Sequence, residues 1–311
     1  MGAPPKSRSQ RSHTPPVAKP SKTSPKQGLR RWVRLVVMTG CLSLLVLSTT
    51  LIGFLFGWHG EMNVPYLLQT LFATALAAAG AAALNQVFEV EFDARMRRTR
   101  NRPLPTHRMS VEEGMIIGVG CSIAGILWLA LGTNLLAGVL AAVTIGSYVF
   151  VYTPLKRVTT LNTIVGALPG ALPPVIGWVA ARGRIDFEAW LLFAILFLWQ
   201  MPHFLALAWL FREDYRQAGF VMLGGTDQSA AMIGRQSLLY TMALISVSLM
   251  PAVVGLTTAW YFIIAATTGS YFCWMSFQFA FHGSEKTARR LFVASIVYLP
   301  ITLGALVLTR A

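Results

Sequence analysis

Charged residues are scarce in this chain. They make up 12% of its 311 residues, whereas water-soluble domains carry about 25%. Hydrophobic residues account for 55% of the chain, and many stretches of roughly 18–24 residues have almost no charge, which is enough to cross a bilayer core. The shortage of charge therefore excludes an ordinary soluble globular domain and predicts an all-α, polytopic membrane protein.

Acidic residues are scarcer than basic ones. The chain has 12 Asp and Glu against 26 Lys and Arg, for a formal net charge of +14. No acid occurs in residues 1–33, which are rich in Pro, Ser, Lys and Gln, a composition that cannot form a packed core. A transit peptide is the alternative, but the prolines disfavour the amphipathic helix it would need. We interpret 1–33 as a basic, disordered cytoplasmic tail and 34–311 as a single intramembrane domain.

Cysteine is nearly absent. The three cysteines, Cys41, Cys121 and Cys273, are far apart and each lies inside an apolar run. Such isolated cysteines usually behave as small hydrophobic residues. The sequence thus gives no sign of a disulfide framework or a thiolate metal site.

Hydropathy predicts about nine transmembrane helices, bundled around a central cavity that faces the cytoplasm. Lys and Arg concentrate in alternate connections, so the positive-inside rule places the N-terminus in the cytoplasm and the C-terminus outside. The two longest polar loops, 91–112 and 211–235, are then expected on the same side. The predicted spans are 35–57, 66–88, 114–132, 135–153, 161–180, 189–210, 236–256, 258–279 and 290–309.

The second span runs into the segment NQVFEVEFDARMRRTRNRPLP, residues 85–105. Its residues Asn85, Glu89 and Asp93 are four apart, so a helix would project all three from one face over about 12 Å of rise. An acid this deep in an apolar run is costly unless it faces water or a cation. One amide and two carboxylates suit Mg²⁺, and we predict a magnesium site here.

Cations that could hold a phosphate follow these acids. Arg98 and Arg102 are the favoured candidates, because a guanidinium grips phosphate at two points; the bland alternative is an ordinary basic cytoplasmic loop. On the same predicted side, Glu213 and Asp214 could complete the metal site. Tyr152, Lys156, Arg157 and Asn162 form a third cluster there.

Several motifs, in order over about 85–223, resemble the UbiA superfamily of intramembrane prenyltransferases. Within it the chain is most similar to the branch that farnesylates haem. Adjacent Glu213 and Asp214 match that branch, whereas many relatives space the two acids four apart. The motifs are residues 85–105, YTPLKR (152–157), NTIVGALPGALPPVIGW (162–178), WQMPHFLALAW (199–209) and EDYRQAGFVML (213–223).

The resemblance implies transfer of farnesyl from farnesyl diphosphate to a vinyl group of haem b, with addition of water to give haem O. Asn85, Glu89, Asp93 and Asp214 would be catalytic through Mg²⁺, with Glu213 as a further ligand. Arg98, Arg102, Lys156 and Arg157 would bind the diphosphate. The setting would be a bacterial inner membrane, with a mitochondrial inner membrane as the alternative. Expected partners are the two substrates, the lipid bilayer and, further off, haem A synthase or terminal-oxidase assembly proteins, but no nucleic acid.

His203 lies inside the sixth predicted span, one helical turn from Gln200. An imidazole inside a membrane span is a functional candidate by default. It could contact haem, position the attacking water, or link two helices through a hydrogen bond. We assign His203, Gln200, Tyr152 and Asn162 to the haem and substrate site, with the helix-linking role as the alternative for His203.

Three other functions remain open at this point. A sister prenyltransferase acting on an aromatic or quinone precursor would keep 85–105 without needing the later motifs. A transporter is disfavoured because no internal duplication is visible. A membrane assembly factor could bind haem without turning it over.

Overall fold

The computed structural model describes residues 40–223 and 229–311, with side chains described from residue 44 onward in the first range. The predicted basic tail, 1–33, lies outside the described residues. So do the first residues of the first predicted span and the side chain of Cys41.

The described chain is all-helical and contains no strand, only an isolated bridge between Thr257 and Arg310. This confirms the predicted fold class. Its elements are α2 (Gly40–Gly57), α3 (Val64–Phe88), α4 (Val90–Arg95), α5 (Val111–Gly132), α6 (Leu135–Gly146), the π-helix η1 (Ser147–Tyr152), α7 (Thr153–Leu155), α8 (Asn162–Ala171), α9 (Pro173–Arg182), α10 (Phe187–Leu210), α11 (Arg212–Ala218), α12 (Ala230–Val253), α13 (Ala259–His282) and α14 (Glu285–Leu308).

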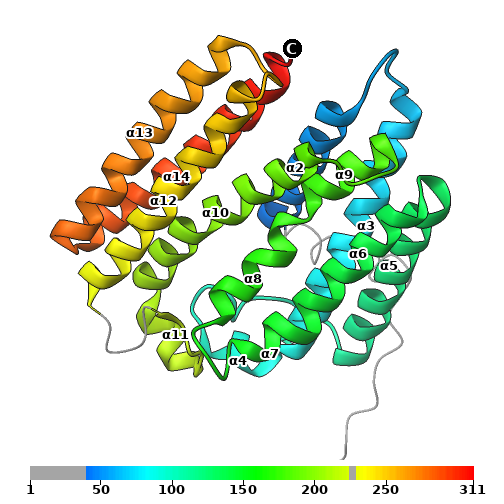
Figure 1. The fold of residues 1–311 in the computed structure, drawn as a ribbon. Coiled ribbons are helices and arrows are strands. Elements are labelled where there is room, and N and C mark those ends of the chain that lie inside the picture. Colours follow the sequence, from blue (N-terminus) through cyan, green and yellow to red (C-terminus); the bar gives the residue numbers. More distant parts are fainter. Residues whose placement is uncertain (1–39, 224–228) are drawn as a thin grey trace, which may run out of the picture.

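The long helices form a bundle with two outer groups (Figure 1). Helices α3, α5 and α6 pack together on one side, and α12, α13 and α14 pack together on the other. Between them run α10 and the interrupted pair α8 and α9. The short helices α4, α7 and α11 gather at one end of the bundle.

Among the described residues, seven helical segments are long and apolar enough to cross a membrane. The protein is therefore an integral membrane protein. The 24-residue helix α13 is not among the seven, and the apolar helix Leu44–Gly57 is shorter. The count of nine spans stays a prediction.

Sequence signals at the helix ends explain several boundaries. Ser110 caps α5 by accepting a hydrogen bond from the Glu113 backbone (3.0 Å), and the Glu113 side chain returns one to Ser110 N (2.9 Å). This reciprocal capping box satisfies donors that a helix start leaves unpaired. Asn134 caps α6 with a single side-chain bond, accepting from Ala137 N at 2.9 Å, and a two-residue connection is enough to reverse the chain.

Small residues let some helices approach closely. A Cβ on Gly125 of α5 would lie 2.5 Å from Ala77 N of α3. A Cβ on Gly177 of α9 would lie 2.0 Å from the Thr50 carbonyl oxygen of α2. Larger side chains at these two positions would push the helices apart, as is common where membrane helices pack on glycine.

The predicted span 161–180 is two helices in the structure, separated at Leu172. Pro169 lies inside α8, and Pro173 and Pro174 begin α9. A proline lacks the N–H that would continue the helical hydrogen bonds, and its ring crowds the preceding turn. The interruption lies beside the cavity described below.

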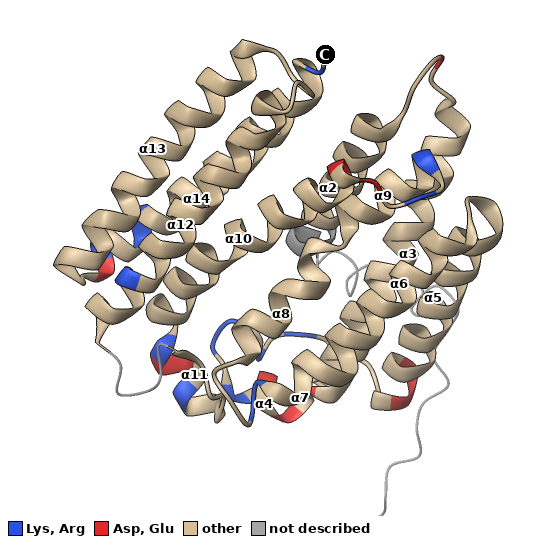
Figure 2. Ribbon diagram, in the orientation of Figure 1, with Lys and Arg blue, Asp and Glu red and all other residues tan. Residues whose placement is uncertain are grey.

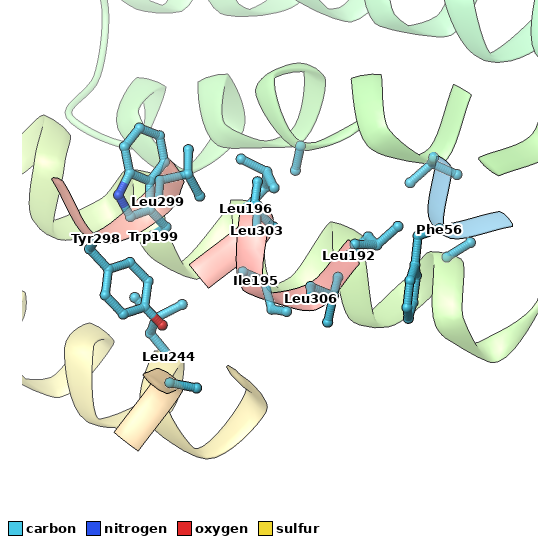
Figure 3. Close-up of a cluster of buried hydrophobic side chains, with 14 of the residues drawn as sticks. Phe56, Leu192, Ile195, Leu196, Trp199, Leu244, Tyr298, Leu299, Leu303 and Leu306 are labelled. Carbon is cyan, nitrogen blue, oxygen red and sulfur yellow. The ribbon is translucent and has the colours of Figure 1, made fainter. Parts of the chain in front are cut away.

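An apolar layer joins α10, α12 and α14 (Figure 3). Polar groups in this layer find protein partners: Tyr298 Oη donates to Ser248 Oγ at 2.7 Å, and Trp199 Nε1 donates to the Ser295 carbonyl at 2.7 Å. The labelled side chains of this core are Phe56, Leu192, Ile195, Leu196, Trp199, Leu244, Tyr298, Leu299, Leu303 and Leu306.

Charged residues gather mainly at the end of the bundle that carries α4, α7 and α11 (Figure 2). The loops after α3 and after α10 meet there. The rings of Phe92 and Phe220 stack with centroids 5.1 Å apart, and Arg97 Nε lies 3.8 Å from Asp214 Oδ1. The sequence-based expectation that these two loops share one side is thus met in the structure.

Candidate functional site

A cavity of about 440 Å³ opens within the bundle beside α3. Its volume falls in the range of about 300–1,000 Å³ that is typical of small-molecule sites. One part of its wall is charged, with Glu89, Asp93, Arg98, Arg102 and Lys156. The rest is mainly apolar and includes Val46, Ala77, Ala78, Ala81, Ala82, Leu129, Ala141, Ile145 and Ile176.

Asn85, Glu89 and Asp93 all line this cavity, as their spacing predicts. Helix α3 ends at Phe88 and α4 begins at Val90, so Glu89 stands at the joint. The backbone still bonds in helical register across it, from Glu89 N to Asn85 O (3.0 Å) and from Asp93 N to Glu89 O (2.8 Å). This preserved register keeps the three side chains on one face.

Asp93 is fully buried. Its Oδ2 accepts a hydrogen bond from Arg102 Nη1 at 2.7 Å, while its Oδ1 has no partner among the described residues. Burial raises the pKa of Asp93 above its usual value, although Arg102 opposes the shift. A cation on Oδ1 would favour the charged carboxylate, so the orphaned oxygen fits a metal ligand.

Glu89 links α3 to the segment after η1. Its Oε1 accepts from Lys156 Nζ at 2.9 Å, and its Oε2 accepts from Asn85 Nδ2 at 3.1 Å. Asn85 Oδ1 in turn accepts from Thr153 Oγ1 at 3.0 Å. Burial by itself lowers the pKa of Lys156, but the Glu89 carboxylate outweighs it and the net pKa is raised. Lys156 is therefore a fixed positive charge in the cavity wall.

The predicted diphosphate-binding arginines divide into two groups. Arg102 and Arg98 line the cavity, and no carboxylate in the described part of the chain forms an ion pair with Arg98. Arg157 does not line it: its Nη2 donates to the Phe88 carbonyl at 2.5 Å, and its guanidinium lies 4.2 Å from the Phe92 ring centre. In this arrangement Arg157 braces the helix joint instead of facing a ligand.

The π-helix η1 brings two tyrosines to the cavity. Tyr148 and Tyr152 both line it, with ring centres 5.6 Å apart. Lys156 Nζ lies 4.5 Å from the Tyr152 ring centre, and Gly166 leaves room for that ring, since a Cβ there would lie 2.4 Å from Tyr152 Cε2. π-Helical turns occur often at functional sites. The sequence reasoning found Tyr152 but missed Tyr148, which lies four residues earlier.

Gln200 and His203 were predicted to share a face toward the substrate. Gln200 lines the cavity and donates to the Ala167 and Leu196 carbonyls at 3.2 and 3.1 Å. His203 does not line it. The Nδ1 of His203 is 2.7 Å from Ser295 Oγ of α14, and its ring stacks on Trp199 with centroids 5.0 Å apart. The contact with Ser295 of α14 matches the helix-linking alternative. Residues three apart point about 60° apart around a helix, so Gln200 can line the cavity while His203 faces α14.

Asn162 is also placed away from the cavity lining. Its Nδ2 donates to the Thr159 and Val221 carbonyls at 2.5 and 2.8 Å, and Val221 N donates to the Lys156 carbonyl at 2.8 Å. These bonds tie the segment after α11 to the start of α8. Asn162 therefore holds Phe220 and Met222, which do line the cavity, without facing it.

Glu213 and Asp214 were predicted to complete the metal site together. The structure leaves Glu213 exposed, where its carboxylate accepts from Arg216 (3.0 Å) and Gln217 (2.9 Å) on the same helix. The Arg216 hydrogen bond is the main reason that the pKa of Glu213 is lowered. Neighbouring residues on a helix point about 100° apart, so Asp214 points elsewhere, and its Oδ1 lies 3.8 Å from Arg97 Nε. Neither acid lines the cavity, and the metal role of both stays a prediction.

Sequence reasoning also missed Gln86. It lines the cavity, is 1% exposed, and neither of its polar atoms has a partner among the described residues. Its neighbour Asn85 could be predicted because it lies four residues before Glu89 and eight before Asp93. Gln86 has no such register, and only the structure reveals it.

Within the described ranges, no group of three or more His, Cys, Asp and Glu side chains is placed to hold a metal. The candidate donors are instead one amide and two carboxylates, at Asn85, Glu89 and Asp93. An all-oxygen set with few protein ligands suits Mg²⁺, which usually keeps waters and substrate phosphates as its other ligands. Together with the orphaned Asp93 Oδ1, these residues fit a hard divalent cation.

Known proteins resemble this chain along most of its length. The family model described as the UbiA prenyltransferase family matches residues 46–299. A protoheme IX farnesyltransferase from Solibacter usitatus is 43% identical over 275 residues, covering 86% of this chain and 94% of the relative.

Solved structures give the same fold at low identity. A digeranylgeranylglyceryl phosphate synthase superposes with a TM-score of 0.77 at 17% identity, covering 91% of this chain and 98% of that one. A UbiA homolog from Archaeoglobus fulgidus, solved with GPP and Mg²⁺, superposes with a TM-score of 0.61 at 13% identity, covering 89% and 99%.

Proposed function

Because the chain belongs to the UbiA prenyltransferase family, we propose that it transfers a farnesyl group from farnesyl diphosphate to a vinyl group of haem b and adds water to give haem O. The observation that carries this is the division of one cavity into a charged wall and an alanine-rich apolar wall. A prenyl diphosphate has the matching division, with an anionic head and a hydrocarbon chain. The 43% identity to a protoheme IX farnesyltransferase supports haem as the acceptor.

The metal in this proposal is Mg²⁺, held by Asn85, Glu89 and Asp93, with Asp214 as a candidate from the facing loop. Bound there, it would neutralise charge that develops on the leaving diphosphate. The UbiA homolog from Archaeoglobus fulgidus that was solved with GPP and Mg²⁺ supports the choice of ion. Glu213 is left out of the ligand set because it pairs with Arg216.

The cavity cations would bind the diphosphate oxygens. Lys156 is already charged and fixed by Glu89 at 2.9 Å, and Arg102 is fixed by Asp93 at 2.7 Å. Charges held in place before the reaction need little rearrangement as the leaving group forms. Arg98 is exposed and has no carboxylate partner among the described residues, and its guanidinium lies 5.8 Å from the Phe211 ring centre, so we propose that it closes on a bound diphosphate.

The proposed reaction breaks one carbon–oxygen bond and forms one carbon–carbon bond and one new carbon–oxygen bond. The C1–O bond of farnesyl diphosphate breaks and its electrons leave with the diphosphate. The vinyl carbon of haem b forms a bond to C1, which leaves a cation on the carbon next to the porphyrin. Water adds to that cation and releases a proton. The apolar wall formed by residues such as Ala78, Ala82 and Ile176 would keep other water away from the allylic cation.

The proposed setting is the inner membrane of a bacterium, with the charged end of the bundle in the cytoplasm. The positive-inside rule supports this orientation, since the loops around α4 and α11 carry many of the arginines. A mitochondrial inner membrane is the second choice. Haem A synthase and terminal-oxidase assembly proteins are the proposed protein partners.

The decisive experiment supplies the purified protein, in lipid nanodiscs, with haem b, farnesyl diphosphate and Mg²⁺. We expect diphosphate release and a heavier haem that carries both farnesyl and one added water, measured by mass spectrometry. Excess chelator should stop both. A parallel reaction contains an aromatic acid in place of haem b. Prenylation of the aromatic acid with no change to haem b would reject haem as the acceptor, and full turnover in chelator would reject the metal.

A further inference from the structure

Gln86 is a carboxamide whose buried polar atoms are left unpaired. It is 1% exposed, and neither Oε1 nor Nε2 has a hydrogen-bond partner in the described part of the chain. Leaving such atoms unpaired in a buried site is unfavourable. A native structure that keeps them usually reserves them for a ligand or an ordered water. Since Gln86 lines the cavity, its partner must be something that the cavity holds.

The other amide and threonine side chains in the cavity wall have protein partners. Asn85 uses both its amide and its oxygen, on Glu89 and Thr153. Gln200 gives its amide hydrogens to two backbone carbonyls, and Thr74 donates to the Thr70 carbonyl at 2.8 Å. Gln86 is the carboxamide that keeps both a donor and an acceptor for a small polar molecule.

The position of Gln86 along α3 indicates which part of a bound substrate it would face. Glu89, at the charged end, lies three residues further on, or about 4.5 Å along the helix axis. Ala82, one turn in the other direction, belongs to the apolar wall. Gln86 thus marks the boundary between the diphosphate site and the hydrocarbon site. A prenyl diphosphate bound with its head at the charged wall and its chain along the apolar wall would place C1, which joins head to chain, at this boundary.

We propose that Gln86 positions the water that completes the reaction. This rests on the proposed function, because haem O formation requires a water to add beside the newly bonded C1. Gln86 Oε1 accepts one hydrogen of that water and Nε2 donates to a second molecule or to the substrate. The water oxygen then forms a bond to the cationic carbon, and its remaining acidic proton passes to an oxygen of the released diphosphate. The carboxamide stays neutral throughout and is a positioning residue.

Without a positioned water, the same cation can react in another way. It can lose a proton from the neighbouring carbon and give an alkene, a product lighter than haem O by one water. The ratio of alcohol to alkene therefore reports on Gln86 alone, whereas diphosphate release reports on the metal and the cations. A purely structural role for Gln86 would not move this ratio.

The test replaces Gln86 with methionine, which has a similar length and no strong hydrogen-bonding group. Wild-type protein and Q86M receive haem b, farnesyl diphosphate and Mg²⁺, and both diphosphate and haem products are measured. We expect diphosphate release to persist and the alcohol-to-alkene ratio to fall by about tenfold or more, the scale of one hydrogen bond. The melting temperature should be unchanged or higher, because Q86M removes an unpaired polar group.

Two further variants make the result decisive. Ser122→Ala is the matched control, because Ser122 is also buried with an unpaired Oγ but does not line the cavity; its products should equal wild type. Gln86→Leu replaces Q86M should that variant fail to fold. An unchanged ratio in a folded Gln86 variant overturns the proposal, and so does loss of diphosphate release together with product. If wild-type protein makes no farnesylated haem, the proposed function itself has failed.

Discussion

The cavity wall formed by α3 and α4 differs from the core between α10, α12 and α14 in whether its buried polar atoms have protein partners. In the core, Tyr298 and Trp199 find protein partners at 2.7 Å. In the cavity wall, Asp93 Oδ1 and both polar atoms of Gln86 have none within the described residues. Helix α3, with 25 residues, is an apolar helix of nearly the same length as α10, α12 and α14, with 24 residues each, so hydropathy alone cannot separate Gln86 from the core residues. Tyr261, whose hydroxyl is buried and unpaired, shows that the rule has exceptions on the core side.

This difference implies a separation of effects. Substitutions that remove the unpaired atoms of the cavity wall should lower activity with little loss of stability, because those atoms have no protein partner among the described residues. Substitutions in the core should do the reverse.

Asp93→Asn should lower diphosphate release by about 10²–10³-fold, the usual cost of removing one electrostatic stabiliser from an active site. Some stability should be lost as well, because the amide keeps the shape of the buried side chain but removes the negative charge that pairs with Arg102 at 2.7 Å. Rates at saturating Mg²⁺ and melting temperatures would be compared with those of Glu213→Gln, an acid removed from the exposed face of α11. Equal diphosphate release by D93N and wild type would show that Asp93 holds no metal.

Lys156→Met should affect both properties, because it leaves Glu89 buried without its cation. Breaking a buried ion pair costs about 3–5 kcal/mol, and the diphosphate also loses a binding charge. The double variant Glu89→Gln with Lys156→Met should recover much of the stability but none of the activity. Denaturation in detergent and turnover would be measured for the wild type, the single variant and the double variant. Recovery of activity in the double variant would show that the pair is purely structural.

Leu244→Ala should act on stability alone. Leu244 is fully buried in the layer shown in Figure 3, and removing such a side chain costs about 2–5 kcal/mol. Turnover per folded molecule should match wild type. A specific loss of turnover at unchanged stability would show that the core and the cavity are coupled.

His203→Ala tests the boundary between the two regions. Since His203 faces Ser295 and not the cavity, the change should cost about 1–3 kcal/mol of stability and leave haem product per folded molecule nearly constant. Ser295→Ala should cost a similar amount, and the double variant should cost less than the sum. A collapse of haem affinity in H203A, with stability intact, would return His203 to the substrate site.

Several features of the site could be predicted from the sequence because they depend on one helix. The four-residue spacing of Asn85, Glu89 and Asp93 fixes their relative angles, and the structure keeps that register across the joint at Glu89. The membrane class follows from composition in the same local way. Arg102 and Lys156 were also identified from their own loops as cavity cations.

The predicted site residues that do not line the cavity have a cause in common. Glu213 and Asp214 are neighbours, and Gln200 and His203 are three apart, so in each pair a small rotation of the helix decides which side chain faces inward. Sequence periodicity gives angles within a helix but not its rotation against its neighbours. The η1 turn adds to this, because a π-helical insertion shifts the register of Tyr148 and Tyr152.

Composition, together with helical geometry within single segments, is enough to predict a helical membrane protein, the places where its charges concentrate, and one face shared by three oxygen-bearing side chains. The packing of separate helices is needed to show that Lys156 reaches Glu89 from 67 residues away, that His203 bonds to α14, and that Gln86 has no partner among the described residues. Such contacts depend on how separate helices pack against one another, and packing of distant segments is a property of the whole bundle.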